Sequence, residues 1–308
     1  MAPKRTRTSE NANSSQKREG SQKRDMRSGT ITEILEAPTD DLIEGPMKPV
    51  KIDRHDEAYA KARHLNTIKQ WGSKFVCDRT TRLLGIQANV DYIFEKLGWE
   101  RLYKSPEPIF RSINREFLAT YTCYFPEDNS IEDAYMEFRL NKKWVRLNMS
   151  QFADILGVPK GIHSLISTTS AYVFQEFWQK IAIQKYSSSA DKISWIQHPA
   201  IRYAHQFMSN SIFARDEPDK IHRLEMGYLY LALQEFHDGL SLDGCVRGGW
   251  SPMDLASRVA IHLYNMANTK AKDVKICVGG IITKIARRVD TGIIFYKEDI
   301  IDGYDALG

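Results

Sequence analysis

The sequence predicts a mainly α-helical, compact multi-helix domain with one small β-hairpin, preceded by a disordered N-terminal tail. Apolar residues recur at helical spacing through most of the chain after residue 57, whereas residues 135–148 alternate apolar and charged side chains as strands do. With 308 residues, 42% of them hydrophobic and 27% charged, the chain has a globular composition and the length for a sizeable core. We therefore expect one helical domain over residues 58–308.

Residues 1–57 are expected to form a disordered tail in two parts of opposite charge. Residues 1–27 hold eight Lys or Arg and three Asp or Glu, and they contain no aromatic residue. Such a segment cannot bury enough apolar surface to offset the entropy lost on ordering. Residues 28–57 hold eight acids against three basic residues, with three prolines, and are expected to form an acidic linker. The net charge of +4 is therefore the sum of +5 on residues 1–27, −5 on residues 28–57 and +4 on residues 58–308.

Periodicity and capping residues predict where the helices begin and end. Asp56–Trp71 carries a single apolar stripe, Asn89 is the expected N-cap of the next helix, and Pro108 is expected to open the one after it. Ser150 is expected to cap a short helix that ends at Gly157. Further helices are expected at Thr169–Ala182, Pro199–Phe213, Leu224–His237, Pro252–Ala267 and Gly280–Val289.

The segment Met226–Leu233 is apolar nearly all round, which is typical of the most central helix of a domain. A charge at Leu231 should therefore unfold the protein. The hairpin is expected to turn at residues 141–143. The expected core includes Phe94, Leu97, Phe117, Leu140, Leu147, Phe152, Ile155, Ile201, Met208, Leu231, Val259 and Leu263.

Short motifs that resemble catalytic signatures have simpler structural interpretations. Asp290-Thr291-Gly292 is the tripeptide of aspartic proteases, but that chemistry needs a second carboxylate, so a helix end followed by a turn is preferred. Residues 239–243 approach a nucleophile elbow, yet Asp243 replaces its last glycine and no βαβ unit surrounds it. The glycine pairs at 248–249 and 279–280 lack the spacing of phosphate loops. We therefore predict no catalytic residue and no enzymatic activity.

The histidines and cysteines lack the spacing of a metal site. His198 and His205 lie two helical turns apart, His237 lies eight residues before Cys245, and no Cys-x₂-Cys occurs. The four cysteines are widely spaced, as expected for thiols in a reducing compartment. The N-terminus lacks a signal peptide, and the longest apolar stretch is far below the roughly 20 residues of a membrane span. We predict no metal, cofactor, small-molecule substrate or membrane partner.

Two groups of basic residues are candidates for nucleic-acid contact. On the hairpin, a cationic face with a tryptophan would meet a phosphate backbone and stack a base; the residues are Arg139, Lys142, Trp144 and Arg146. A solvated sheet face with an arginine resting on the indole is the alternative. Lys284, Arg287 and Arg288 share one face of the last helix and extend a basic cluster that also contains Lys270, Lys272 and Lys275.

The N-terminal tail resembles a bipartite nuclear import signal. The basic pairs that carry this similarity are Lys4-Arg5, Lys17-Arg18 and Lys23-Arg24. A tail of net charge +5 would also bind nucleic acid weakly, in a salt-dependent manner and without sequence preference. A solvated tail with no partner is the alternative. The expected location is the nucleus or the cytoplasm, with the nucleus favoured.

Several blocks in collinear order carry a family resemblance. They are Phe117–Tyr121, Met136–Leu140, Ser150–Pro159, His198–Tyr203, Ile212–Arg215 and Gly279–Ala286. Their order and spacing over residues 75–290 resemble the first-reading-frame, Gag-like product of plant Athila-type retrotransposons, which are gypsy-class LTR elements. The strand–turn–strand–helix unit that ends at Pro159 is also similar to the plant mobile domain.

This resemblance implies a plant source and a non-enzymatic, Gag-like structural role. It implies self-association and contact of low specificity with element RNA or DNA, and it supplies no catalytic residues to transfer. The similarity to the mobile domain implies a nuclear, chromatin-associated module as the alternative. The chain has no zinc knuckle and ends soon after the Gly279–Ala286 block, so a fragment or a non-functional relic of an element is a further interpretation.

Overall fold

The computed structural model describes residues 42–44, 51–72, 74–104, 107–127, 131–161, 171–186, 191–213, 215, 217–233, 254–271, 275–301 and 305–306. Chain contacts define two units, Met1–Thr39 and Asp40–Gly308, and all described residues belong to the second. The predicted import signal and Lys272 lie outside the described residues, as do His237, Asp243 and Cys245. Part of the predicted acidic linker is described, and there Leu42 and Ile52 pack against the core.

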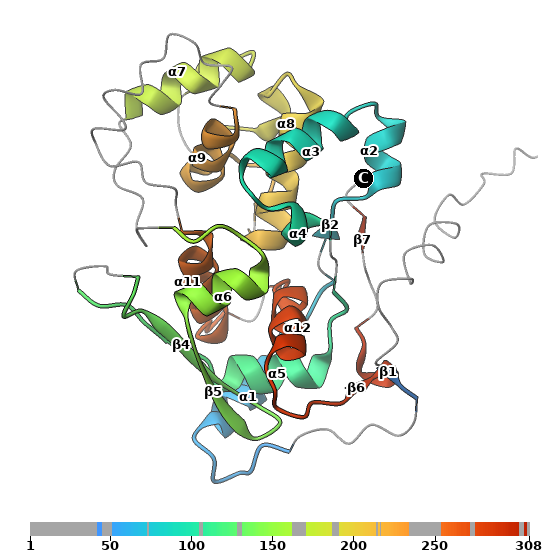
Figure 1. The fold of residues 1–308 in the computed structure, drawn as a ribbon, viewed down its shortest axis with the longest axis vertical. Coiled ribbons are helices and arrows are strands. Elements are labelled where there is room, and N and C mark those ends of the chain that lie inside the picture. The colour runs from blue at the N-terminus through green and yellow to red at the C-terminus, as the bar shows by residue number, and fades with distance from the viewer. Residues whose placement is uncertain are drawn as a thin grey trace, which may run out of the picture. The chain divides into compact units, whose positions relative to one another are not determined.

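Helices dominate the described residues, which confirms the predicted mainly α fold (Figure 1). Their bounds are α1 Ala58–Leu65, α2 Asp78–Leu83, α3 Gln87–Lys96, α4 Glu100–Tyr103, α5 Arg111–Thr120, α6 Met149–Leu156, α7 Ala171–Ile181, α8 Pro199–Phe207, α9 Arg223–Ala232, α11 Leu255–Ala267 and α12 Gly279–Arg288. A π-helical turn, Met208–Ile212, continues α8, and short 3₁₀ turns cover Ile193–Trp195 and Lys297–Asp299.

The predicted hairpin is confirmed, and it belongs to a three-stranded antiparallel sheet of order β3-β4-β5. The strands are β3 Thr122–Tyr124, β4 Tyr135–Leu140 and β5 Lys143–Asn148. β3 was not predicted, because three residues are too few to show alternation. The described residues also form two parallel pairs of two-residue strands. They are β1 Leu42–Ile43 with β6 Phe295–Tyr296, and β2 Lys74–Phe75 with β7 Asp305–Ala306.

The hairpin turn is shorter than predicted. Lys143 pairs with Leu140 in the ladder, so the turn consists of Asn141 and Lys142 alone. These two residues have φ values of 50° and 65°, as both central positions of a type I′ turn require. This turn twists in the same sense as the strands that it joins, and it therefore sets the register of β4 against β5.

Several predicted helix starts are wrong by one to three residues. Asn148 caps α6 in place of Ser150: its side chain accepts the Gln151 N–H at 2.8 Å, and Gln151 Oε1 accepts the Asn148 N–H at 3.0 Å. This reciprocal arrangement is a capping box, and it satisfies two amides that the helix itself leaves unpaired. Asn89 lies inside α3, and Pro108 precedes the first turn of α5.

The predicted core is confirmed except at two positions. Ile155 and Leu231 are only partly buried, whereas the other predicted side chains are buried. In α9, Leu229 is fully buried and both Tyr228 and Tyr230 are 2% exposed, so the helix is buried nearly all round as predicted. The prediction that Leu231 lies at the centre of the fold is therefore wrong, because the helix turns Leu229 inward.

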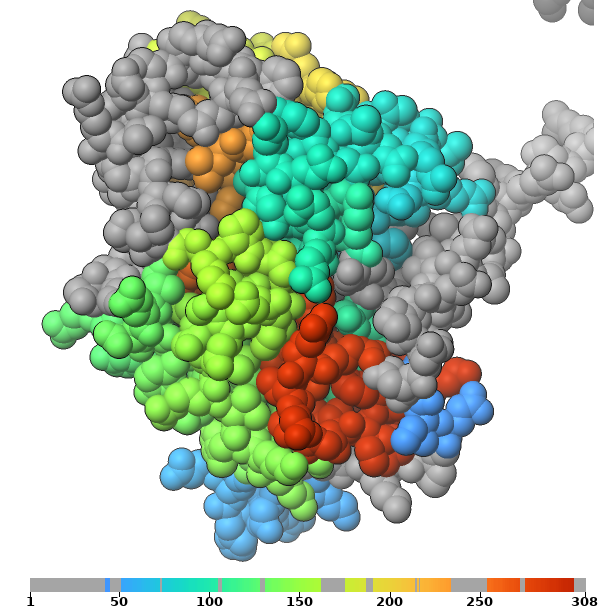
Figure 2. Space-filling view, viewed as in Figure 1, coloured from blue at the N-terminus to red at the C-terminus, as the bar shows by residue number. Residues whose placement is uncertain are grey.

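Helices cover one face of the three-stranded sheet and leave part of the other face exposed. β4 packs against α5, and α5 in turn contacts α11 and α12 (Figure 1). Figure 2 shows α6 and α12 side by side on one face of the domain, next to the strands of the hairpin. The inner sheet residues Met136, Phe138 and Leu140 are fully buried. On the opposite, outer face, Tyr124 and Trp144 are exposed, whereas the Arg139 side chain reaches Glu116 of α5.

Candidate functional site

The outer face of the β3–β4–β5 sheet carries the hairpin residues that the sequence singled out. Strand alternation brings Arg139 opposite Trp144 and Glu137 opposite Arg146. The Trp144 side chain is 61% exposed on this face. Tyr124 and Tyr135 pair across β3 and β4 on the same face, and Tyr124 is 50% exposed. The structure therefore adds two tyrosines that sequence analysis did not assign to the site.

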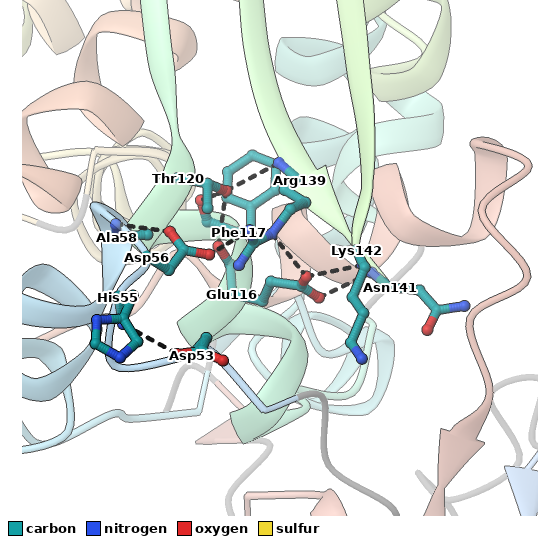
Figure 3. Close-up of polar contacts among 10 residues, drawn as sticks. All are labelled: Asp53, His55, Asp56, Ala58, Glu116, Phe117, Thr120, Arg139, Asn141 and Lys142. Carbon is teal, nitrogen blue, oxygen red and sulfur yellow. Dashed lines mark hydrogen bonds and ion pairs between the residues drawn. The ribbon is translucent and has the colours of Figure 1, made fainter.

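Arg139 is bound on both sides by carboxylates. Its Nη1 lies 2.6 Å from Asp56 Oδ2, and its Nε donates to Glu116 Oε1 at 3.2 Å (Figure 3). The hydrogen bond from Arg139 lowers the pKa of Asp56. The Arg139 side chain is only 13% exposed. Two acids thus offset its positive charge, and it positions the sheet instead of presenting a free cation on the surface.

Glu116 of α5 also anchors the hairpin turn. Its Oε2 accepts the Asn141 N–H at 2.8 Å, and its Oε1 accepts the Lys142 N–H at 3.0 Å (Figure 3). Thr120, one turn further along α5, accepts the Arg139 N–H at 2.8 Å. One carboxylate, 3% exposed, therefore receives three donors from the hairpin. The side chain of Lys142 is exposed, while its amide is committed to α5.

The turn also contacts the segment that follows α12. Asn141 Nδ2 donates to the carbonyl oxygens of Thr291 and Gly292, both at 3.0 Å. Gly292 has a φ of 68°, and Asp290 is exposed directly after the helix. The interpretation of residues 290–292 as a helix end followed by a turn is confirmed.

Arg146 rests on a tyrosine and not on the predicted indole. Its guanidinium carbon lies 4.3 Å from the centroid of the Tyr135 ring, and its Nη2 lies 3.1 Å from Glu137 Oε1. Tyr135 in turn lies 5.4 Å from Tyr124 between ring centroids. The Arg146 side chain is 60% exposed. The outer face therefore presents an arginine stacked on one tyrosine, with a second tyrosine beside it and the Trp144 indole open to solvent.

The basic residues of α12 are largely engaged within the fold. Arg287 Nε lies 2.9 Å from Glu107 Oε2, and its guanidinium packs over the Phe295 ring at 4.6 Å. Lys284 Nζ donates to the Arg101 carbonyl oxygen at 3.2 Å, and burial lowers the pKa of this lysine. Arg288 is exposed. Of the three predicted contacts on this helix, Arg288 is the one that stands out from the surface.

His198 and His205, which the sequence singled out, lie before and within α8. His198 Nδ1 accepts the Ala200 N–H at 3.2 Å and so caps α8. His205 is fully buried, and within the described residues neither ring nitrogen has a hydrogen-bond partner. Burial lowers the pKa of His205 to about 4 and that of His262 to about 4. No group of three or more His, Cys, Asp or Glu in the described part of the chain could hold a metal ion.

An ion pair between a partly exposed arginine and a buried glutamate lies close to these two histidines. Arg215 Nε lies 2.8 Å from Oε1 of Glu225, whose side chain is 0% exposed. The charge on Glu225 raises the pKa of His205 and His262, but the effect is smaller than that of burial. Both rings are therefore neutral near pH 7.

The architecture and the open sheet face define a class: a helical domain that displays a small antiparallel sheet with an aromatic, partly basic outer surface. The family model for the ATHILA ORF-1 family matches residues 15–297. The chain therefore belongs to the ATHILA ORF-1 family, which is a family of retrotransposon origin. No curated protein and no solved structure matches it. Over the described ranges, no helix combines the length and the apolar character needed to cross a bilayer.

Proposed function

We propose that this retrotransposon-derived protein is a non-enzymatic, Gag-like protein that binds single-stranded nucleic acid on the outer face of the β3–β4–β5 sheet. One observation carries the proposal: Trp144 and Tyr124 are 61% and 50% exposed on the same sheet face, next to an arginine stacked on Tyr135. Exposed aromatic rings on a sheet are suited to stacking unpaired bases, and each stacked base contributes about 1–3 kcal/mol.

Charge makes a small contribution at this face, so we expect weak binding with little sequence preference. Asp56 and Glu116 offset the charge of Arg139, and Glu137 offsets that of Arg146. Lys142 at the turn is exposed and adds positive charge at this end of the sheet. Stacking does not distinguish strongly between bases, because every base has an aromatic face.

The test is fluorescence anisotropy with a labelled 20-nucleotide single strand and the full-length chain. Loss of one stacked base predicts that Trp144→Ala weakens binding by about 5- to 150-fold. Tyr264→Ala is the matched control, because Tyr264 is a 40% exposed aromatic residue on α11. Equal affinities for Trp144→Ala and the unchanged protein would contradict the assignment of this face.

We further propose that the protein self-associates, as a Gag-like role in packaging element RNA requires. Family membership over residues 15–297 supports this part of the proposal. Light scattering over a range of protein concentrations, with and without RNA, is the direct measurement. A strict monomer at high concentration that also binds no RNA at low salt would reject the Gag-like role.

The second candidate function is that of a nuclear module in contact with chromatin. The spacing of Lys4-Arg5 and Lys17-Arg18 favours it. A fluorescently tagged protein should enter the nucleus of plant cells, and alanine at these four positions should keep it in the cytoplasm. Cytoplasmic location of the unchanged protein would argue against this function.

A further inference from the structure

A second basic and aromatic surface lies where two distant loops pair. The predicted helix Asp56–Trp71 ends at Leu65, and its last residues instead run alongside the segment before α12. The Trp71 N–H donates to the Ile276 carbonyl oxygen at 3.0 Å, and the Ile276 N–H donates to the Lys69 carbonyl oxygen at 3.2 Å. This pairing forms a short parallel bridge between Gln70 and Ile276.

Backbone alternation at this bridge gathers three side chains. Lys69 and Trp71 flank Gln70, and Lys275 precedes Ile276, which is 1% exposed. The Nζ of Lys69 lies 4.0 Å from the centroid of the Trp71 ring, and that of Lys275 lies 4.7 Å from it. The two ammonium groups are therefore less than about 10 Å apart, close enough to contact the same stretch of a phosphate backbone.

These two lysines carry charge that the described fold does not balance. Both are exposed, and among the described residues neither forms an ion pair with a carboxylate. In contrast, Arg139, Arg146 and Arg287 each have a carboxylate partner. Lys270 is also exposed, and it follows Thr269, whose carbonyl oxygen lies 3.0 Å from His64 Nε2 at the end of α1. Within the described ranges, the junction therefore carries positive charge that no carboxylate pairs with.

The Trp71 ring holds the two lysines in place and is too little exposed to stack a base. Its ring is only partly exposed, and its Nε1 is buried. An ammonium group held over an indole loses less side-chain freedom when it binds an anion. This surface is therefore suited to phosphate groups and not to bases.

We propose that Lys69 and Lys275, held over Trp71, form a phosphate-backbone contact for the single strand whose bases stack on the sheet. This proposal rests on the proposed function, because it adds an electrostatic contact with the phosphates of the same single strand to the stacking of its bases. Base stacking on the sheet face contributes affinity that depends little on salt concentration. Phosphate contacts at the lysine junction release counterions, so their contribution to affinity depends strongly on salt concentration.

The experiment is a salt titration of binding, from 50 to 200 mM, with the labelled 20-nucleotide strand and the full-length chain. For single strands each neutralised phosphate contributes about 0.7 to the slope of log K against log salt, so Lys69→Gln/Lys275→Gln should reduce that slope by about 1.4. The unchanged protein should then lose about sevenfold more affinity across this range than the double variant. Lys69→Arg/Lys275→Arg should keep the slope, because it keeps the charge.

Lys220→Gln is the matched control, because Lys220 already pairs with Glu217 at 2.6 Å. It should leave the slope unchanged, and Trp144→Ala should lower the affinity at every salt concentration without changing the slope. An unchanged slope in the double glutamine variant, with circular dichroism equal to that of the unchanged protein, would overturn the assignment of Lys69 and Lys275. If Trp144→Ala still weakens binding in that case, the proposed function stands. If the unchanged protein binds no strand at 50 mM salt, the proposed function itself fails.

Discussion

Glu116 is expected to stabilise the domain far more than an acid on the surface of the same sheet. Its carboxylate accepts hydrogen bonds from Arg139 Nε and from the amides of Asn141 and Lys142 while 3% exposed. In Glu116→Gln the side-chain amide has one oxygen for these three donors, and its own N–H groups face one or more of them. At least one buried donor then loses its partner.

The magnitude follows from burial. Removing one member of a buried, hydrogen-bonded ion pair costs about 3–5 kcal/mol, and Asp56 still binds Arg139, so we expect about 3 kcal/mol. For a domain of this size that loss lowers Tm by about 6–12 °C. Glu137→Gln is the matched control: Glu137 also pairs with an arginine on the hairpin, but the two side chains are 33% and 60% exposed. Its loss should cost less than about 1 kcal/mol.

Urea unfolding followed by circular dichroism measures both losses in the same buffer. Arg139→Met and the double variant Glu116→Gln/Arg139→Met complete a double-mutant cycle, whose coupling energy should be about 1–3 kcal/mol because the two side chains are in contact. If the two glutamine variants lose the same stability within about 0.5 kcal/mol, the anchoring role of Glu116 is refuted.

Three further predictions concern stability. His205 and His262 have a folded pKa of about 4, below the unfolded value near 6.5. The stability present above pH 6.5 should therefore decrease as the pH is lowered towards 4, by up to about 3 kcal/mol per histidine. A urea midpoint that stays constant when the pH is lowered from 7 to 4 would contradict this. Asn148→Ala removes the capping box of α6 and should cost about 1 kcal/mol in thermal or urea unfolding, and no change would show that the cap is dispensable. Leu229→Ala should cost about 2–5 kcal/mol and Leu231→Ala clearly less, and the reverse order in urea unfolding would refute the burial of Leu229.

The hairpin shows how much of the candidate site could be predicted from sequence. Alternation placed Arg139, Trp144 and Arg146 on one face, because side chains of a strand point to opposite sides in turn. The same rule could have added Tyr135, which lies in register with them. It could not have identified Glu116 or Asp56 as partners, because their approach to Arg139 depends on how α1 and α5 pack against the sheet.

The surface at Trp71 illustrates the same limit. In the sequence, Lys275 belongs to a basic cluster with residues of α12. In the structure it lies over the same indole ring as Lys69, more than 200 positions earlier in the chain. No local sequence pattern predicts that these two distant lysines share one aromatic ring. The burial of His205 is likewise a property of the packed helices around it.

By itself, the sequence determined the helical class, the hairpin and most of the buried stripes, since helix and strand periods and turn residues act over a few neighbouring positions. Only the tertiary structure decided which charges are neutralised and which remain on the surface. Arg139 and Arg146 look alike in the sequence, yet Arg139 is 13% exposed between two acids, whereas Arg146 is 60% exposed on a tyrosine. The physical reason is that electrostatic interactions act through space, between groups that the chain brings together from distant positions.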